Sequence, residues 1–272
     1  FHVVFQVKEL SEVKSVAVSG NTLVPTDKII ESLLTKEGEF FSKEHVDHDV
    51  DTIKDLYKEA GYIAIVSDVN NKDGNVTFTI AEARVEAVNY RGNTKTKNWV
   101  IDKTVNKIIK TGDFLTTDAL QKIYTKLMQT GYFNPVDGVR ISADEGTDAD
   151  HVVLNIDFIE GKTGEWRLGA GYSDHYKGQV VGGVSEGNLG GKGEKVGVNF
   201  GVGKGKTEFD LYYTIPYWKK SDTSVSFNVF NNSKNIKSSG YEFKEKHSGG
   251  SVSMLKPIGK DQRTKFFSVL SF

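Results

Sequence analysis

Glycine and lysine gather in one stretch of the sequence, Asn188–Phe209 (NLGGKGEKVGVNFGVGKGKTEF), as they do in phosphate-binding loops. A Walker-type loop requires the pattern GxxxxGK[ST], because successive backbone N–H groups must wrap around the phosphates. Both Gly-Lys pairs that could end such a pattern lack its leading glycine, since Glu186 and Phe200 stand at those positions. We therefore expect no nucleotide site here and interpret Gly201–Lys206 as a hairpin turn.

Histidine and carboxylate side chains gather between His45 and Asp51. His45 and Asp49 are four residues apart on an expected helix, so they could ligate a metal together. The favoured interpretation is a solvated acidic helix N-terminus, because the helix dipole stabilises carboxylates there. Cysteine is absent, and His175 and His247 have no nucleophile arranged with them. We expect no catalytic residue, no metal and no cofactor, and hence no enzyme.

The composition excludes some partners and leaves others open. The 272 residues carry a formal charge of −1 with a pI near 6.7, which gives no basic field for nucleic acid. Charged residues at 26% and hydrophobic residues at 38% are typical of globular proteins. The sequence has no apolar run long enough for a transmembrane helix. Transmembrane strands give a much weaker signal, so a membrane location stays possible.

An internal repeat organises the first part of the chain. Three motifs recur in the same order at nearly constant spacing: GNT at 20–22 and 92–94, GEFFS at 38–42 with GDFLT at 112–116, and LYKEAGY at 56–62 with KLMQTGY at 126–132. The period is longer than that of ordinary solenoid repeats, so each copy is expected to be a small domain. We place these domains at residues 11–83 and 84–161.

Each copy has the pattern of a β-α-α-β-β unit, and so belongs to the α+β class. A strand ends at the Gly-Asn turn, a short helix follows (to Leu34, or over Trp99–Ile109), and Ser42 or Thr116 caps a second helix. That helix ends at Gly61 or Gly131, which suit a left-handed C′ position. Two strands complete the unit: Ile63–Val69 and Val76–Glu82 around a turn at Asn70–Asn75, and Val139–Ala143 and Val152–Glu160 around a turn at Asp144–Asp150.

Beyond Thr163 the apolar residues recur at every second position, which predicts strands with one apolar and one polar face. In Glu165–Tyr172, for example, Trp166 and Leu168 oppose Arg167 and Gly169. About seven such strands can be counted: Thr163–Tyr172, Gln179–Gly187, Glu194–Gly203, Thr207–Pro216, Ser224–Asn231, Phe243–Leu255 and Thr264–Phe272.

The alternation alone allows either a membrane barrel or a soluble β-sandwich. The length of most of the segments, their succession as a meander and their terminal aromatic residues favour a barrel. Those aromatic residues are Trp166, Tyr172, Tyr212, Tyr213, Tyr217, Trp218 and Tyr241.

The order of the repeat, with its Gly-Asn-Thr turn and Gly-Tyr helix end, resembles the POTRA domain. Two such units continue into EWRLGAGYSD, then SEGNLGGKGEKVGVNF, YTIPYW and GGSVSMLKPI, and this arrangement resembles the Omp85 family. The resemblance implies that residues 1–10 end a preceding POTRA domain. It also implies that residues 162–272 form the N-terminal part of an outer-membrane β-barrel, so that the barrel here is incomplete.

The resemblance further implies a factor that assembles outer-membrane proteins, with its POTRA domains in the periplasm. Clients would pair with the first barrel strand: Gly164, Glu165, Trp166, Arg167, Leu168, Gly169, Ala170, Gly171 and Tyr172. Edge strands of the POTRA domains are expected to bind unfolded clients or accessory lipoproteins: Ile63, Ala64, Ile65, Val66, Val139, Arg140 and Ile141. Lipid of the outer membrane is a further expected partner, and nucleic acid is not.

Two alternatives remain open at this point. A relative with the same layout could export proteins, as in two-partner secretion or the translocation-and-assembly branch. A soluble periplasmic scaffold, with POTRA domains and a β-sandwich, is the other. The glycines of the first strand, Gly164, Gly169 and Gly171, suit a weak junction between the first and the last strand of such a barrel. They also suit simple clearance of the barrel lumen or curvature of the strand.

Overall fold

The computed structural model describes residues 11–174, 177–238, 240–258 and 264–272. The predicted strand Phe1–Glu9 and His175 lie outside these residues. Contacts between Cα atoms divide the chain into two compact units. One runs to Arg91 and adds Lys103–Lys126 and Arg140–Asp157, and the other contains Gly92–Asp102, Leu127–Val139 and Phe158–Phe272.

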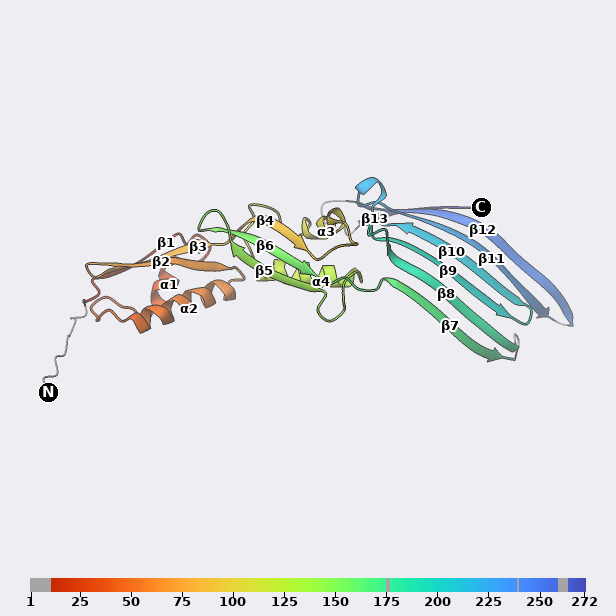
Figure 1. The fold of residues 1–272 in the computed structure, drawn as a ribbon, viewed down its shortest axis with the longest axis horizontal. Coiled ribbons are helices and arrows are strands. Elements are labelled where there is room, and N and C mark those ends of the chain that lie inside the picture. The colour runs from red at the N-terminus through yellow and green to blue at the C-terminus, as the bar shows by residue number, and fades with distance from the viewer. Residues whose placement is uncertain (1–10, 175–176, 239, 259–263) are drawn as a thin grey trace. The chain divides into compact units, whose positions relative to one another are not determined.

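The first repeat folds in the predicted order. Its elements are β1 (Ser15–Ser19), α1 (Thr26–Ser32), α2 (Lys43–Glu59), β2 (Ala64–Lys72) and β3 (Asn75–Glu82). The sheet order is β1-β3-β2, with β1 parallel and β2 antiparallel to the central β3. Helix α2 packs against this sheet, as Figure 1 shows, and the core between them includes Ile53, Tyr57 and Phe78.

The second repeat has the same topology. Its elements are β4 (Arg84–Arg91), α3 (Asn98–Val105), α4 (Thr117–Gln129), β5 (Val139–Glu145) and β6 (His151–Phe158). The sheet order is β4-β6-β5, so the last strand of the copy is again central and parallel to the first. The β-α-α-β-β prediction is therefore confirmed for both copies.

The predicted helix signals hold, while several boundaries move. Ser42 caps α2, its hydroxyl accepting the His45 N–H at 3.4 Å, and Thr116 does the same for the Ala119 N–H at 3.0 Å. Gly61 follows the end of α2 with φ +84°. The prediction was wrong for α3, which ends at Val105 although Ile109 stays buried. The hairpin of the first copy is also tighter than predicted, because only Asp73 and Gly74 separate β2 from β3.

One carboxylate in each repeat holds the Gly-Asn-Thr loop. Glu82, at the end of β3, accepts hydrogen bonds from the backbone N–H of Thr22 at 2.6 Å and of Leu23 at 2.7 Å, and from the Tyr57 hydroxyl at 2.8 Å. Glu160 accepts in the same way from the N–H groups of Lys95 at 2.7 Å and Thr96 at 2.5 Å. Each loop is therefore fixed by the strand that closes its own repeat.

The loop glycines are required by close approach. Gly20 and Gly92 have φ near the left-handed region, at +81° and +84°. A Cβ on either would lie 2.1 Å from a carbonyl oxygen of the central strand, that of Ile80 or Phe158. The recurring GNT motif is thus explained by backbone packing inside each copy.

Glu82 makes the first repeat sensitive to acid. Burial raises the pKa of this carboxyl, but the bonds from the Thr22 side chain and from the N–H groups of Leu23 and Thr22 outweigh burial and lower the pKa below its ordinary value. Stability from Glu82 is therefore complete above the ordinary pKa and is lost as pH falls through the lowered one. We expect Glu82→Gln to cost about 1–3 kcal/mol at neutral pH and to weaken this acid dependence.

Hydrogen exchange of the first repeat, followed from pH 7 downward in the whole protein, measures both effects. Glu37→Gln is the control, because Glu37 is exposed on the same repeat. Equal exchange in the two variants at pH 7 would contradict the assigned role of Glu82.

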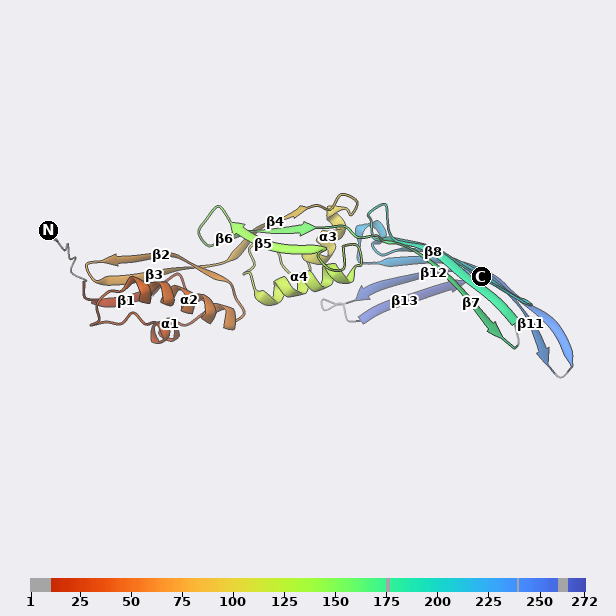
Figure 2. The ribbon, with the colours of Figure 1, turned by 60° about the horizontal axis from the view of Figure 1, so that its bottom comes forward.

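The last part of the chain forms one antiparallel sheet of seven strands in sequence order. The strands are β7 (Gly164–Ser173), β8 (Lys177–Leu189), β9 (Glu194–Gly203), β10 (Lys206–Ile215), β11 (Ser224–Ser238), β12 (Tyr241–Ile258) and β13 (Thr264–Ser271), with a short 3₁₀ turn, Trp218–Lys220, before β11. Figures 1 and 2 show them side by side as a curved sheet. The predicted meander is confirmed, and Gly201–Lys206 contains a hairpin turn as expected. Among the described residues, no helix is both long and apolar enough to span a membrane.

Candidate functional site

Strand β7 is an edge strand of the sheet in the part of the chain that the structure describes. It pairs with β8 in an unbroken register from Gly164–Glu186 to Ser173–Lys177. One step before this register, the Thr163 carbonyl accepts the Gly187 N–H at 2.9 Å. In an antiparallel ladder such bonded pairs alternate with pairs whose backbone groups point away from the partner strand. The backbone N–H and C=O groups of Trp166, Leu168, Ala170 and Tyr172 therefore point to the open edge.

The apolar side chains of the sheet form one continuous exposed face. The strand register aligns a row of apolar residues across five strands: Trp166, Val184, Val198, Leu211 and Val229. On β7, Trp166, Leu168 and Tyr172 are 78%, 70% and 71% exposed. In the described residues no second sheet covers this face, so the packing that a β-sandwich requires is not found there.

The opposite face carries a chain of polar side chains. The Arg167 guanidinium donates to the Asn199 amide oxygen at 3.1 Å, and the Asn199 amide donates to Asp210 at 3.4 Å. Asp210 also accepts from the amide of Asn228 at 2.6 Å. Gly183 lies between Arg167 and Asn199, and a Cβ there would come within 2.6 Å of the Asn199 oxygen.

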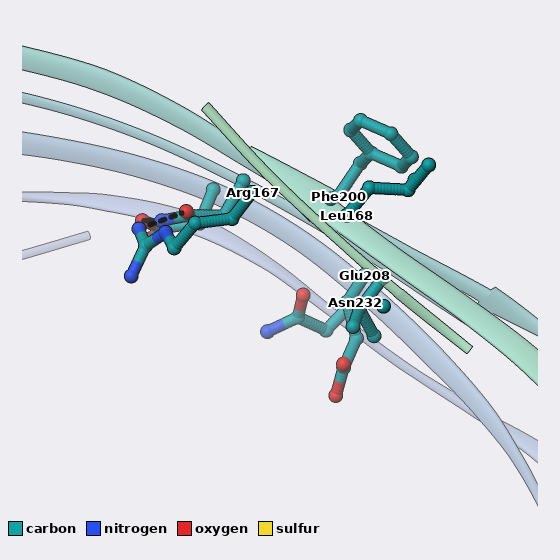
Figure 3. A pocket seen from close by; sticks show the side chains of 10 residues that line it. Arg167, Leu168, Phe200, Glu208 and Asn232 are labelled. Atoms are coloured by element: carbon teal, nitrogen blue, oxygen red, sulfur yellow. Dashed lines mark hydrogen bonds between the residues drawn. The ribbon is translucent and has the colours of Figure 1, made fainter. Parts of the chain in front are cut away.

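Figure 3 shows the two faces together. Arg167, Glu208 and Asn232 lie on one side of the sheet, and Leu168 and Phe200 on the other. Adjacent residues of β7 thus present a charged and an apolar side chain to opposite sides. This is the arrangement that a wall between lipid and water requires.

The glycines of β7 are not explained by tight packing. A Cβ on Gly164 or Gly171 would have no neighbour closer than 3.6 Å, and one on Gly169 would approach only a methyl group of Val181, at 3.3 Å. By contrast, a Cβ on Gly197 in β9 would come within 2.5 Å of the Tyr212 ring. Clearance is therefore a poor reason for glycine in β7.

The predicted edge residues of the repeats lie where expected, with one exception. β2 and β5 stand at the edges of their sheets, so Ala64, Ile65, Val66, Val139, Arg140 and Ile141 belong to edge strands. Ile63 was wrongly included, because it precedes β2 and its backbone is already bonded to Leu115 and Ala83. An apolar hollow of about 350 Å³ beside β5 is lined by Ile63, Ile65, Leu115, Leu120 and Ile141, among others.

The candidate metal pair has a different role. Asp49 is fully buried on α2, and its carboxylate accepts the N–H groups of Leu34 at 2.5 Å and Thr35 at 2.9 Å. The expectation of a solvated acidic helix end was therefore wrong for Asp49, which fixes the segment after α1. Within the described residues, no three His, Cys, Asp or Glu side chains are grouped as metal ligands.

Several residues that shape these sites were missed from the sequence. Glu82 is the last residue of the central strand of its copy and Glu160 follows the central strand of the other by two residues, so the repeat itself contained the signal that could have found them. Asn199 and Asp210 alternate with apolar neighbours like many surface residues, and nothing in the sequence pairs them with Arg167.

Comparison with known families and structures agrees with this architecture. A model of the Omp85 superfamily domain matches residues 188–270, and the POTRA model, described as surface antigen variable number repeat, matches residues 11–83 and 83–161. The two POTRA matches together cover more than half of the chain. Tandem POTRA modules that continue into a sheet of amphipathic antiparallel strands define the class. The chain belongs to the Omp85 family.

Relatives of known identity fit this family. The chain is 25% identical over 235 residues to the outer membrane protein assembly factor BamA of Nitratidesulfovibrio vulgaris, covering 83% of the chain and 28% of that protein. The fold resembles BamA from Haemophilus ducreyi lacking POTRA domains 1–3, with a TM-score of 0.62, 22% identity, and coverage of 97% of this chain and 50% of that one. It also resembles CdiB from Escherichia coli, with a TM-score of 0.56, 16% identity and coverage of 92% and 47%. The chain spans less than a third of the length of its curated relatives.

Proposed function

We propose that this chain is part of an outer-membrane protein assembly factor that templates client β-strands along the open edge of β7. The single observation that carries the proposal is the coincidence at this edge of two features. Backbone groups of Trp166, Leu168, Ala170 and Tyr172 point outward and have no partner strand within the described residues, and the side chains of the same residues belong to the exposed apolar face. The relationship to BamA supports the same function.

The physical reason lies in the backbone of the client. An unpaired N–H or C=O group in hydrocarbon costs several kcal/mol, so an isolated strand cannot enter the membrane. A client strand that pairs with β7 by β-augmentation has one side of its ladder satisfied before it enters. The apolar side chains of β7 place this ladder at the depth of the lipid.

The POTRA modules would receive clients before they reach β7. Strands β2 and β5 are edge strands, and the hollow beside β5 offers apolar contacts for a peptide that adds to that edge. We place the modules in the periplasm and the sheet in the outer membrane, with unfolded outer-membrane proteins, accessory lipoproteins and lipid as partners.

Protein export is the second candidate. The likeness to CdiB fits it, although at 16% identity that likeness concerns the fold alone. An exporter would use the polar face of the sheet as the wall of a passage, whereas an assembly factor would use the edge of β7.

Reconstitution of the whole protein in lipid vesicles separates the two candidates. We expect client barrels to become integral to the bilayer, and we expect deletion of Gly164–Tyr172 to reduce this integration to the level of protein-free vesicles. Circular dichroism and hydrogen exchange should show both POTRA modules still folded in the deletion variant. Normal integration after the deletion would refute the proposal, and release of clients inside the vesicles would favour export.

A further inference from the structure

The turn between β8 and β9 is partly buried, because Gly191 and Gly193 are buried while Gly190 and Lys192 are exposed. Asn188 is 1% exposed, and its amide nitrogen donates to the Thr96 hydroxyl at 2.9 Å. The amide oxygen of Asn188 accepts the Gly193 N–H at 2.8 Å, which closes the turn on itself. A short hairpin turn at the end of a sheet normally stands in water, so its burial indicates a built contact.

The surface that covers this turn is the Gly-Asn-Thr loop of the second repeat. The Lys97 N–H donates to the Gly191 carbonyl at 2.9 Å. A Cβ on Gly191 would lie 1.8 Å from the Lys95 carbonyl oxygen, so only glycine allows the two backbones to approach this closely. Residues Gly92–Asp102 accordingly belong to the same compact unit as the sheet. Among the glycines of this turn, Gly191 serves this contact, whereas a Cβ on Gly193 would meet the Tyr132 hydroxyl and one on Gly190 would have no neighbour within 4 Å.

Beside the turn, Lys95, Thr163 and Glu186 form a triangle of hydrogen bonds. The Lys95 ammonium group donates to the Thr163 hydroxyl at 2.8 Å and to the Glu186 carboxylate at 3.5 Å. The Thr163 hydroxyl donates to the same carboxylate, which also accepts the Asn188 N–H at 2.7 Å. The Glu186 side chain is partly buried, at 27% exposed, and the Lys95 side chain is 43% exposed.

The triangle lies at the base of β7. Thr163 directly precedes the strand, and its carbonyl is bonded to Gly187. Glu186 belongs to β8, and Lys95 to the loop that Glu160 fixes. Three elements are thereby held together at this one end. Further along β7 the residues facing Val181 and Gln179 are Gly169 and Gly171, which have no side chains that could hold the strand.

We infer that Lys95, Thr163 and Glu186 are positioning residues that clamp the base of β7 while the rest of its edge pairs with a client. The inference rests on the proposed function, since it assigns the clamp to the strand that templates. With its base held in register with β8, β7 is most mobile at its other end, which contains Gly169 and Gly171. A client strand that pairs there starts from a defined register.

The test compares Lys95→Met with Lys192→Met in the whole protein in lipid vesicles. Lys192 is an exposed lysine of the same turn and lies outside the triangle. We expect Lys95→Met to speed hydrogen exchange at Thr163–Arg167 about tenfold, the effect of losing one hydrogen bond to a charged group. Client insertion should slow severalfold, and Lys192→Met should change neither. Thr163→Val should reproduce the effect, and Lys95→Arg should restore both readouts.

Each outcome decides between the inference and the function on which it rests. Unchanged exchange at β7 in both Lys95→Met and Thr163→Val overturns the clamp, whatever happens to insertion. Faster exchange with unchanged insertion overturns the positioning role, because it shows that clients do not need the clamp, whereas the templating function fails only if insertion also survives the deletion of Gly164–Tyr172. Faster exchange with slower insertion, both restored by Lys95→Arg, supports the inference.

Discussion

Replacing Val184 by arginine is expected to destabilise the membrane-inserted sheet by about 1–3 kcal/mol, because a cation that faces lipid costs about 2–4 kcal/mol at the bilayer midplane and about 0–1 kcal/mol near the interface. Val184 lies inside the row that runs from Trp166 to Val229, and its side chain is 65% exposed. Exposed valine on a sheet face costs little in lipid but is unfavourable in water. The free energy of unfolding of the whole protein in lipid vesicles, from urea titration, measures this cost.

The same substitution at Val181 is the matched control. Val181 lies on β8 three residues from Val184, but its side chain faces the polar side, where it covers Gly169 and Gly201. It is 47% exposed, so arginine has room and reaches water. We expect Val181→Arg to change the free energy of unfolding by less than about 1 kcal/mol. Equal destabilisation by the two variants would show that lipid does not lie on the apolar face.

Replacing Ala170 by proline is expected to slow client insertion more than tenfold while β7 stays paired with β8. The N–H of Ala170 points to the open edge, so proline removes a group available to a client and no bond to β8. An N–H or C=O left unpaired in hydrocarbon costs several kcal/mol, and each 1.4 kcal/mol corresponds to a factor of ten. The rate of client integration into vesicles gives the result.

Two variants of neighbouring residues isolate the role of this N–H. Ala170→Val keeps the N–H and suits a strand, so client insertion should proceed at a nearly normal rate. Gly169→Pro removes an N–H that points to β8, and hydrogen exchange should then reveal a broken β7–β8 ladder. If Ala170→Pro inserts clients as fast as Ala170→Val, the open edge of β7 is not the template.

Alternation of side chains predicted the sheet well because each strand has two chemically different faces. β9 was predicted at its exact bounds, and the hairpin turn within Gly201–Lys206 was expected from its glycines. The prediction for β11 stopped at Asn231, whereas the strand continues to Ser238. The added residues are mostly polar and carry no alternating signal. Their pairing with β12 holds them in the strand.

The candidate site was predictable only in part, because most of its contacts join residues distant in sequence. The edge position of β7 followed from the resemblance, while the outward direction of the Ala170 N–H required the register with β8. The burial of Asn188 against Thr96, and of Asp49 against Leu34, depends on packing between separate segments. Local sequence patterns carry no information about such contacts.

The most direct measurement of the central claim is a disulfide between β7 and a client strand. The chain contains no cysteine, so a single cysteine introduced at Leu168 or Ala170 is unique. The client is arrested during assembly and carries one cysteine at successive positions of a terminal strand. Pairing brings Cα atoms to the separation of about 4.4–6.8 Å that a disulfide requires.

The account predicts that cysteines at positions 168 and 170 couple to client positions that shift in step by two residues, as a regular ladder requires. A cysteine at exposed Lys192 should not couple, since that residue lies outside β7. Coupling of the client to other strands alone, with none at β7, would contradict the account.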